Sequence, residues 1–458
     1  MTGLAARNGG RIGLAALVAI LLLGAGLRLD NAWRGRAPVY DAQGYASIAV
    51  NLERGEGFSL GPGATQPASN YSPGLPLFVS GVYAVAGGVH ERTARLVLAL
   101  LGTLSVLFAY LIGRRLAGPP AGLVGAAAVA IYPAILEYQG MLMSEPLAAS
   151  LLSGAVLAML WAAGPASPGA RVLSRGKGGL ADSPVRTPPS PAPPARGWLV
   201  PGLLLGALAL VRPEYLAISL PVAVVVFARR GRDDWRAGLV QALVMLVGVA
   251  MIVVPWTVRN EVALGRFVPI STGGGQVLFA GSYMPSGGDP ERVGAEVLER
   301  HPELRQELPP NPRLEQILAA LAKQRYPELE SDAALARMGR ERLWDDVSER
   351  PVEYAGFVAA KLWLIWGHGP RDVMREPLWE ALHWLLVALG LLGLGVLAWQ
   401  RRWEALLLGV VLVAVTATGA LLVASPRRAL VTIPVVAALA GVATTWVVRT
   451  CTGRRTSA

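Results

Sequence analysis

Ten apolar runs of membrane-crossing character recur along the chain, and they constrain its fold more than any other feature. Crossing about 30 Å of hydrocarbon takes about 20 predominantly apolar residues in a helix. The runs are residues 12–29, 93–112, 121–136, 144–163, 198–211, 213–228, 238–256, 378–399, 405–423 and 429–448. Hydrophobic residues make up 53% of the chain and charged residues only 16%, a composition that excludes an ordinary soluble domain. We predict an all-α integral membrane protein with about ten transmembrane helices.

Basic clusters between the runs predict the orientation, because Lys and Arg are enriched in cytoplasmic loops. Six such clusters occur at alternate ends of the runs, at Arg7/Arg11, Arg114/Arg115, 171–196, 229–236, Arg401/Arg402 and Arg449/Arg454/Arg455. They place both termini in the cytoplasm and residues 30–92 and 257–377 outside. An opposing group, Arg28, Arg34 and Arg36, begins a loop so long that the charge rule weakens. The clusters also account for the net charge of +11, so nucleic acid is not an expected partner.

The first run follows two arginines, as the apolar core of a signal peptide would. It is longer than such a core and lacks a small-residue cleavage site, so we treat it as a retained span. The lone cysteine, Cys451, lies in the predicted cytoplasmic tail and excludes an intrachain disulfide.

Three segments lie outside the runs. Residues 164–197 contain the proline-rich string PPSPAPP and too few apolar residues for a core, which predicts a disordered cytoplasmic linker. Residues 257–377 have helical spacing at 314–326 and 333–347, with loops at 273–275 and 285–290, and predict a small, mainly helical outer cap. Residues 354–366 are apolar but short, and we expect an amphipathic helix at the membrane interface.

Two carboxylates stand at the predicted outer surface. Asp41 precedes an amphipathic stretch, 42–52, and Glu145 follows Ser144 at the outer end of the fourth span. Simple structural roles are open for both: Asp41 as the N-cap of the helix that follows, and Glu145 as a charge favoured at a helix N-terminus that Ser144 caps. Chemistry at the membrane surface is the alternative, and it is compatible with capping.

Arginines gather at the same predicted surface. Arg212 lies in the tight hairpin between two short spans, Arg259 and Asn260 stand where the seventh span emerges, and Arg427 and Arg428 occupy another outer hairpin. A charge at that depth indicates function by default, and a guanidinium binds phosphate through two parallel hydrogen bonds. Arginines that merely reach up to lipid phosphates are the alternative.

These residues resemble the polytopic GT-C glycosyltransferases, in particular the family 39 or protein-mannosyltransferase-like group that includes the aminoarabinose transferases of lipid A. The matching pieces cover most of the chain in order: Asp41 with Tyr45, then YSPGLPLF at 71–78, SEPL at 144–147, Arg212-Pro213, PWTVRN at 255–260 and PRR at 426–428.

The resemblance implies a seven-span catalytic module at 1–256, followed by the cap at 257–377, further transmembrane helices at 378–448 and a tail at 449–458. It implies transfer of a sugar, on the extracytoplasmic side, from a polyprenyl-phosphate donor to a hydroxyl of a protein, lipid or glycan, with inversion expected. Asp41 matches the catalytic base and Glu145 a second acidic residue of the site. We assign donor-phosphate binding to Arg212, Arg259, Arg427 and Arg428, and substrate binding to Tyr45, Tyr71 and Asn260.

No cofactor is implied, and a divalent metal stays open. The aminoarabinose transferases have a glutamate just before the proline of the first-loop motif, whereas residues 69–72 read SNYS. The four histidines, His90, His301, His368 and His383, lack ligand-like spacing and are interpreted as interfacial or structural. Two other classes fit a polytopic chain: a secondary transporter, which internal repeats and interrupted midplane helices would favour, and a non-catalytic scaffold that presents the cap.

Overall fold

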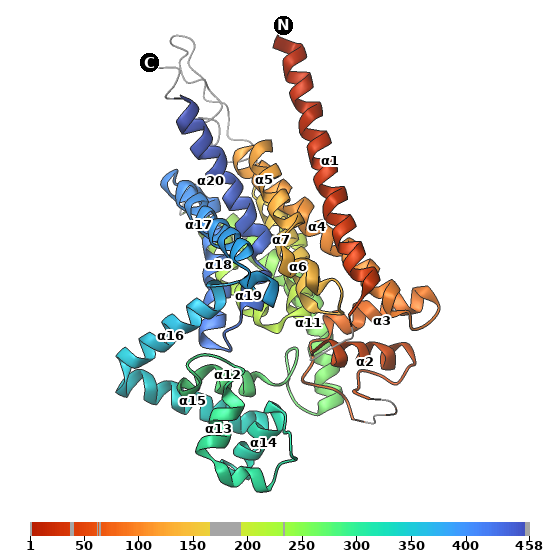
Figure 1. Cartoon of the computed structure of the whole chain (residues 1–458), viewed down its shortest axis with the longest axis vertical. Helices are drawn as coiled ribbons and strands as arrows, with labels where there is room; N and C mark the ends of the chain where they lie inside the picture. The colour runs from red at the N-terminus through yellow and green to blue at the C-terminus, as the bar shows by residue number, and fades with distance from the viewer. Residues whose placement is uncertain are drawn as a thin grey trace.

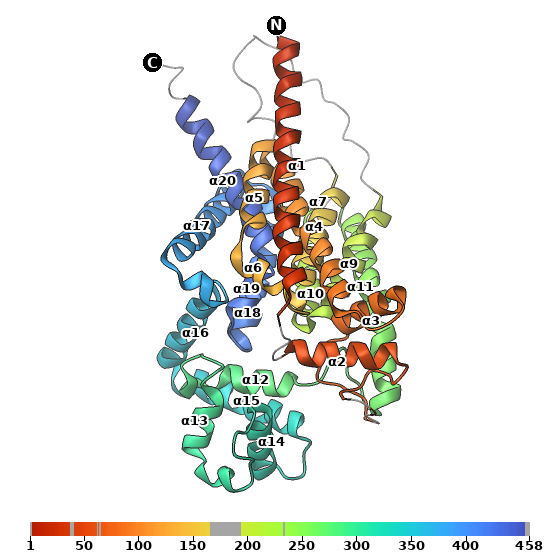
Figure 2. The same ribbon diagram turned by 45° about the vertical axis from the view of Figure 1, so that its right-hand side comes forward.

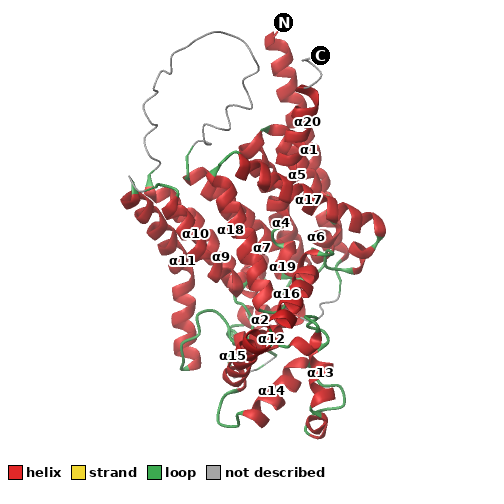
Figure 3. Ribbon diagram, turned by 90° about the vertical axis from the view of Figure 1, so that its left-hand side faces the viewer, coloured by secondary structure: helices red, strands yellow, loops and turns green. Residues whose placement is uncertain are grey.

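A computed structural model describes residues 2–36, 41–61, 63, 66–164, 194–231 and 234–453. The elements of these residues are helical, apart from one isolated bridge between Ser59 and Pro67 (Figure 3). The all-α prediction is confirmed for them. Most of the predicted linker at 164–197 and the last five residues of the tail lie outside the described residues.

Seven helices in the described part of the chain are long and apolar enough to cross a membrane, so the chain is a multi-pass membrane protein. They are α1 (Thr2–Arg34, apolar from Arg11), α4 (Glu91–Ala117), α7 (Ser144–Ala162), α11 (Trp235–Leu264), α17 (Pro377–Trp399), α18 (Trp403–Leu421) and α20 (Ile433–Gly453). The other three predicted spans are shorter apolar helices, namely α5 (Pro119–Ala130), η1 with α9 (Ala195–Val211) and η2 with α10 (Pro213–Ala228). The count of ten therefore stays a prediction.

The predicted run 121–136 is divided into two helices. The helix α5 ends at Ala130, and α6 (Pro133–Tyr138) starts with a proline. The buried guanidinium of Arg28, from α1, donates to the carbonyl oxygens of Val129 at 3.0 Å and Ala130 at 3.2 Å. A cation that bonds the last carbonyls of a helix also complements its dipole. Arg28, which opposed the other clusters in the topology prediction, thus has a structural role.

The helix α7 lies at the centre of the bundle, since 78% of its apolar window is buried against 17% for α1. Small residues allow the neighbouring helices to approach closely. A Cβ on Gly202 of α9 would lie 2.0 Å from the carbonyl oxygen of Met245 in α11, and one on Gly441 of α20 would lie 2.0 Å from that of Ala121 in α5. α7 itself, whose first turn carries Glu145, packs against α4 and α9.

The start of α1 and the end of α20 lie at one end of the molecule, and a group of short helices lies at the other (Figure 1). That group, called the cap below, consists of α12 (Gly274–Ser282), α13 (Val293–Arg300), α14 (Leu314–Arg325) and α15 (Ser331–Glu349), with the 3-10 turns η3 (Met284–Ser286) and η4 (Pro302–Gln306). Its core of Phe279, Val297, Leu318 and Ala334 is fully buried. α14 and α15 match the predicted helices. The expected loop at 273–275 is wrong, because α12 begins at Gly274.

Two further features differ from the predicted boundaries. The helix α11 continues past residue 256 to Leu264, so the seventh span projects beyond the predicted module. The segment between α1 and α4 contains the predicted helix, α2 (Asp41–Glu53), and an unpredicted apolar one, α3 (Gly74–Ala86). α2 and α3 pack together at the same end of the bundle as the cap (Figure 2).

Between the cap and the last spans runs α16 (Pro351–Trp366), which corresponds to the predicted amphipathic helix at 354–366. A turn with η5 (Asp372–Arg375) leads from it to α17. A short helix, α19 (Pro426–Leu430), precedes α20 and carries Arg427 and Arg428 to the cap end of the bundle (Figure 1).

Candidate functional site

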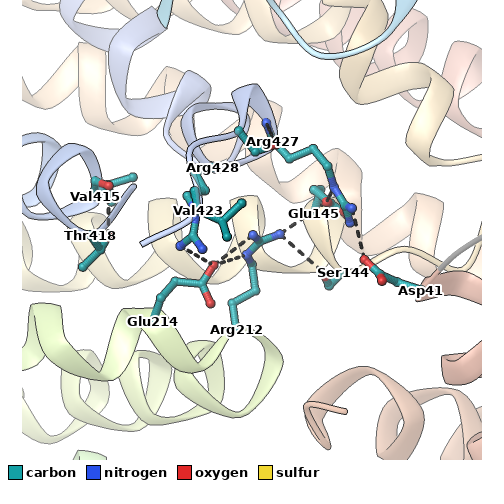
Figure 4. A network of polar contacts seen from close by, with 11 residues as sticks. Asp41, Ser144, Glu145, Arg212, Glu214, Val415, Thr418, Val423, Arg427 and Arg428 are labelled. Carbon is teal, nitrogen blue, oxygen red and sulfur yellow. Dashed lines mark hydrogen bonds and ion pairs between the residues drawn. The ribbon is translucent and has the colours of Figure 1, made fainter. Parts of the chain in front are cut away.

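Asp41 is the first residue of α2, and its carboxylate contacts the other end of the chain. Its Oδ2 accepts a hydrogen bond of 3.1 Å from Nη1 of Arg427 (Figure 4). The side chain of Asp41 remains 47% exposed. The predicted capping bond is not among the described contacts of Asp41, whereas an ion pair with a distant arginine is. The carboxylate is thus held from one side and open on another.

Glu145 lies in the first turn of α7 and is only 1% exposed. Its Oε1 accepts a bond of 2.6 Å from Nε of Arg427 and one of 3.3 Å from Nη1 of Arg212. The expected cap is wrong in one respect: Met143 occupies the N-cap position, and Ser144, the first helical residue, accepts a long contact from Arg212 at 3.5 Å. Two arginines, in addition to the helix N-terminus, compensate the buried charge of Glu145.

Arg212 holds two carboxylates at once. Besides Glu145, it contacts Oε1 of Glu214 through Nε at 3.0 Å and Nη2 at 2.9 Å. Glu214 in turn lies 3.3 Å from Nη1 of Arg428. The sequence analysis assigned no role to Glu214, although its position two residues after Arg212 was a signal for an ion pair.

Six residues therefore form one continuous chain of alternating charge (Figure 4). In order, they are Asp41, Arg427, Glu145, Arg212, Glu214 and Arg428. They come from α2, α7, α19 and the α9–α10 hairpin, which are far apart in sequence. Three guanidiniums balance three carboxylates, and removal of one member would leave the network with an uncompensated charge.

The open side of Asp41 faces a cavity of about 910 Å³. Asp41, Tyr138 and Arg427 line it from the bundle, and Leu298, Leu314 and Ile317 line it from the cap. The turn at 368–372 forms a further wall. Of the six residues in the network of ion pairs, only Asp41 and Arg427 line this cavity. The chain of ion pairs thus reaches the open space through one carboxylate and one guanidinium.

Tyr45 and Tyr71 lie close to the network of ion pairs. Their rings make an edge-to-face contact with centroids 5.5 Å apart. Burial, with a smaller effect of the Asp41 charge, raises the pKa of the Tyr45 hydroxyl above its usual value. Tyr45 is therefore a neutral, buried residue that packs close to Asp41.

Arg259 and Asn260 occupy a different position. The guanidinium of Arg259 stacks over Trp256 at 4.8 Å and over Phe58 at 5.4 Å, and its Nη1 donates to Oδ1 of Asn260 at 3.1 Å. The buried amide of Asn260 donates to the carbonyl oxygens of Val268 and Ile270. None of these contacts involves the network of ion pairs, and neither residue lines the cavity beside Asp41. In the part of the chain that the structure describes, no group of three His, Cys, Asp or Glu side chains could hold a metal ion.

Residues 69–173 match the model of the dolichyl-phosphate-mannose-protein mannosyltransferase family. The resemblance to the protein-mannosyltransferase family is confirmed. The matched residues include Tyr71 and Glu145. No curated protein matches the chain.

Solved structures are similar to this chain. The archaeal oligosaccharyltransferase AglB from Archaeoglobus fulgidus, in complex with an inhibitory peptide and a dolichol-phosphate, is 17% identical with a TM-score of 0.55. The match covers 97% of this chain and 51% of AglB, so the chain spans about half the length of that protein. ArnT from Cupriavidus metallidurans, bound to undecaprenyl phosphate, is 17% identical with a TM-score of 0.39 and covers 92% of this chain and 77% of that one. The likeness to AglB shows that the bundle has a GT-C fold.

Proposed function

We propose that this protein transfers a sugar from a polyprenyl-phosphate donor to an acceptor hydroxyl, with Asp41 as the base. The observation that carries the proposal is the half-exposed carboxylate of Asp41 beside the 910 Å³ cavity, tied through Arg427 to the buried Glu145. A carboxylate that is both positioned and accessible meets the geometric requirement for a general base.

The chemistry needs one base. As the acceptor oxygen attacks the anomeric carbon, its proton moves to Asp41, and the bond from that carbon to the phosphate oxygen breaks with its electrons on the phosphate. A phosphate leaves without prior protonation, unlike the alkoxide that a glycosidase must protonate with a second carboxyl group. Direct displacement inverts the configuration at the anomeric carbon.

The contacts divide the arginines into two roles. Arg427 lines the cavity and has a side chain 29% exposed, so it is the one best placed to bind the departing phosphate. Arg212 is 13% exposed and engaged with two glutamates, which favours positioning Glu145 over direct contact with the donor. Arg428 supports this arrangement through Glu214. Arg259 and Asn260 contribute, in this proposal, through the packing of the first outer loop.

An apolar groove of about 710 Å³ suits the polyprenyl chain of the donor. It lies between α16, α17 and α18, and Leu362, Trp363, Leu391 and Leu412 are among its lining residues. The donor chain is an isoprenoid hydrocarbon, which gains free energy by leaving water for such a surface. AglB, which shares the fold, has been solved with a dolichol-phosphate. The cavity beside Asp41 and Arg427 and the apolar groove together match the charged and the apolar part of such a donor.

A transfer assay tests the proposal. Purified protein is mixed with a polyprenyl-phosphate-linked sugar and with acceptors that offer a hydroxyl on a peptide, a lipid or a glycan, and free polyprenyl phosphate is measured. We expect release that depends on both the protein and an acceptor. Movement of solute across proteoliposomes without any release would instead support a transporter, and neither activity would support a scaffold.

The reaction is proposed to occur on the extracytoplasmic side, as the basic clusters predict. Cys451 is exposed at the end of α20 and reports one side. Ser348, exposed on α15 of the cap, reports the other when Ser348→Cys is made in a Cys451→Ser background. In intact cells, an impermeant maleimide is expected to label the Ser348→Cys protein and to spare Cys451 in the parent. The reverse pattern would place the site in the cytoplasm.

A further inference from the structure

The turn that joins α16 to η5 is fixed by several contacts. Nε2 of His383 lies 2.9 Å from the carbonyl oxygen of Trp366, while Nδ1 of the same ring lies 2.9 Å from the hydroxyl of Tyr132. A Cβ on Gly369 would lie 2.8 Å from the side chain of Met374 and 3.0 Å from the Tyr132 hydroxyl. The backbone of this turn therefore has little room to move.

Arg371 closes the turn in an unusual conformation. Its φ is +83°, a value that non-glycine residues rarely adopt. Its Nε donates to Oε2 of Glu137 at 2.8 Å, which holds the residue in place. Strained backbone that is fixed by its surroundings is concentrated at functional sites. The residue that such a rigid turn presents is His368.

His368 has a ring without a hydrogen bond in the described part of the chain. Its Nδ1 is buried and has no partner, and the ring lines the cavity beside Asp41 and Arg427. A buried polar atom without a partner requires an explanation, because it has lost its hydrogen bond to water. Sequence analysis interpreted His368 as interfacial or structural, and nothing in its sequence neighbours indicated otherwise.

His368 also lies at the boundary between the apolar groove and the cavity beside Asp41. Trp366 and Gly367 line the apolar groove between α16, α17 and α18, whereas His368, Gly369 and Pro370 line the cavity beside Asp41 and Arg427. Groove and cavity thus meet at consecutive residues of one rigid turn. A polyprenyl phosphate has the same division, with an apolar chain directly joined to a charged head.

We propose that His368 binds the phosphate of the polyprenyl donor, at the junction between the apolar groove and the cavity beside Asp41 and Arg427. The inference rests on the proposed function. A neutral imidazole carries its proton on one nitrogen and accepts at the other. A proton on the buried Nδ1 would leave an N–H group without an acceptor, whereas an unprotonated Nδ1 would leave an acceptor without a donor. Buried N–H groups without a partner are the rarer of the two in proteins. We therefore assign the tautomer that carries its proton on Nε2, from which it would donate to a phosphate oxygen.

Binding of undecaprenyl phosphate to the purified full chain tests this assignment with three substitutions. His368→Gln places an amide N–H near the position of Nε2, His368→Asn places one near Nδ1, and His368→Phe keeps the ring shape without a donor. Relative to the parent, the expected dissociation constants rise at least tenfold for Asn and Phe and less than threefold for Gln. Undecaprenol, which lacks the phosphate, is expected to bind all four proteins alike.

Substitution of His90, an exposed residue before α4 that does not line the cavity, provides the matched control as His90→Gln. Undecaprenyl phosphate bound equally by the parent and the Phe protein would overturn the assignment, as would retention by Asn and not by Gln. If the Phe protein fails to fold, the comparison of Gln with Asn decides. A parent protein that does not bind undecaprenyl phosphate would contradict the proposed function itself.

Discussion

At the scale of single residues, Arg427 is the member of the site that joins the accessible carboxylate to the buried one. Its Nη1 contacts Asp41 and its Nε contacts Glu145, so one planar group fixes the distance between two acids from different helices. A lysine has a single nitrogen and cannot reproduce this fork. The same guanidinium lines the cavity, where the proposed phosphate departs.

Arg427→Lys is therefore expected to lower the rate of sugar transfer about 10- to 100-fold, the loss that corresponds to one hydrogen bond between charged groups at about 1.5–3 kcal/mol. The matched control is Arg34→Lys, since Arg34 makes an exposed ion pair with Asp30 away from the site. Initial rates of both proteins, with their melting temperatures, provide the measurement. Equal rates would show that charge alone suffices at position 427.

The sequence identified five of the six residues in the chain of ion pairs, because charged side chains at the ends of apolar runs are conspicuous. Their pairing was not predictable. Which of Arg212, Arg259, Arg427 and Arg428 would meet depends on how the hairpins pack in three dimensions. Arg259 illustrates the difficulty: like Arg212, it stands at the end of an apolar run, yet its neighbours in space are the aromatic rings of Phe58 and Trp256.

At the scale of elements, the placement of α2 depends on a close approach at Gly44. A Cβ there would lie 2.2 Å from the ring of Tyr71, well inside contact distance. Tyr71 also packs edge-on against Tyr45 of the same helix. A Cβ at position 44 would therefore force the Tyr71 ring to move away from α2.

Gly44→Ala is expected to destabilise the protein by about 1–3 kcal/mol through overpacking, although alanine is the better helix former. The control is Gly356→Ala in α16, where a Cβ meets nothing within 4 Å and where the same change is expected to stabilise by up to about 1 kcal/mol. Thermal unfolding in detergent compares the two. A Gly44→Ala protein at least as stable as the Gly356→Ala protein would show that the contact between position 44 and the Tyr71 ring is not tight.

Element boundaries were the part of the fold that the sequence predicted least well. The spans themselves follow from apolar length, but the break between α5 and α6 coincides with carbonyl groups bonded by Arg28 from another helix. The glycine-rich stretch at 273–275 indicated a loop, whereas Gly273 has a φ of +93° and precedes the helix α12. Such tertiary contacts override local propensity.

At the scale of the whole molecule, one buried lysine ties the cap to the bundle. Nζ of Lys361, on α16, donates to the carbonyl oxygens of Gly281 in α12 at 2.7 Å and of Leu422 after α18 at 2.6 Å. Because the cap forms one wall of the cavity, this tie also maintains the shape of the site.

Lys361→Met is expected to leave two carbonyl groups without their donor, at a cost of about 1–3 kcal/mol each, and to loosen the cap. Limited proteolysis of the purified protein measures this as faster cleavage within residues 265–350. The control is Lys323→Met, because Lys323 is exposed on α14. Cleavage at the parental rate in both proteins would show that other contacts hold the cap.

The transfer rate of Asp41→Asn tests the central claim most directly. Asparagine is nearly isosteric and can still occupy the first turn of α2, so the protein is expected to fold as the parent does. Loss of the base is expected to lower the rate by roughly two to four orders of magnitude. Asp372→Asn is the control, because Asp372 is an exposed aspartate that lines the same cavity outside the chain of ion pairs, and its rate is expected to stay near the parental value. A folded Asp41→Asn protein that transfers sugar at close to the parental rate would contradict the account.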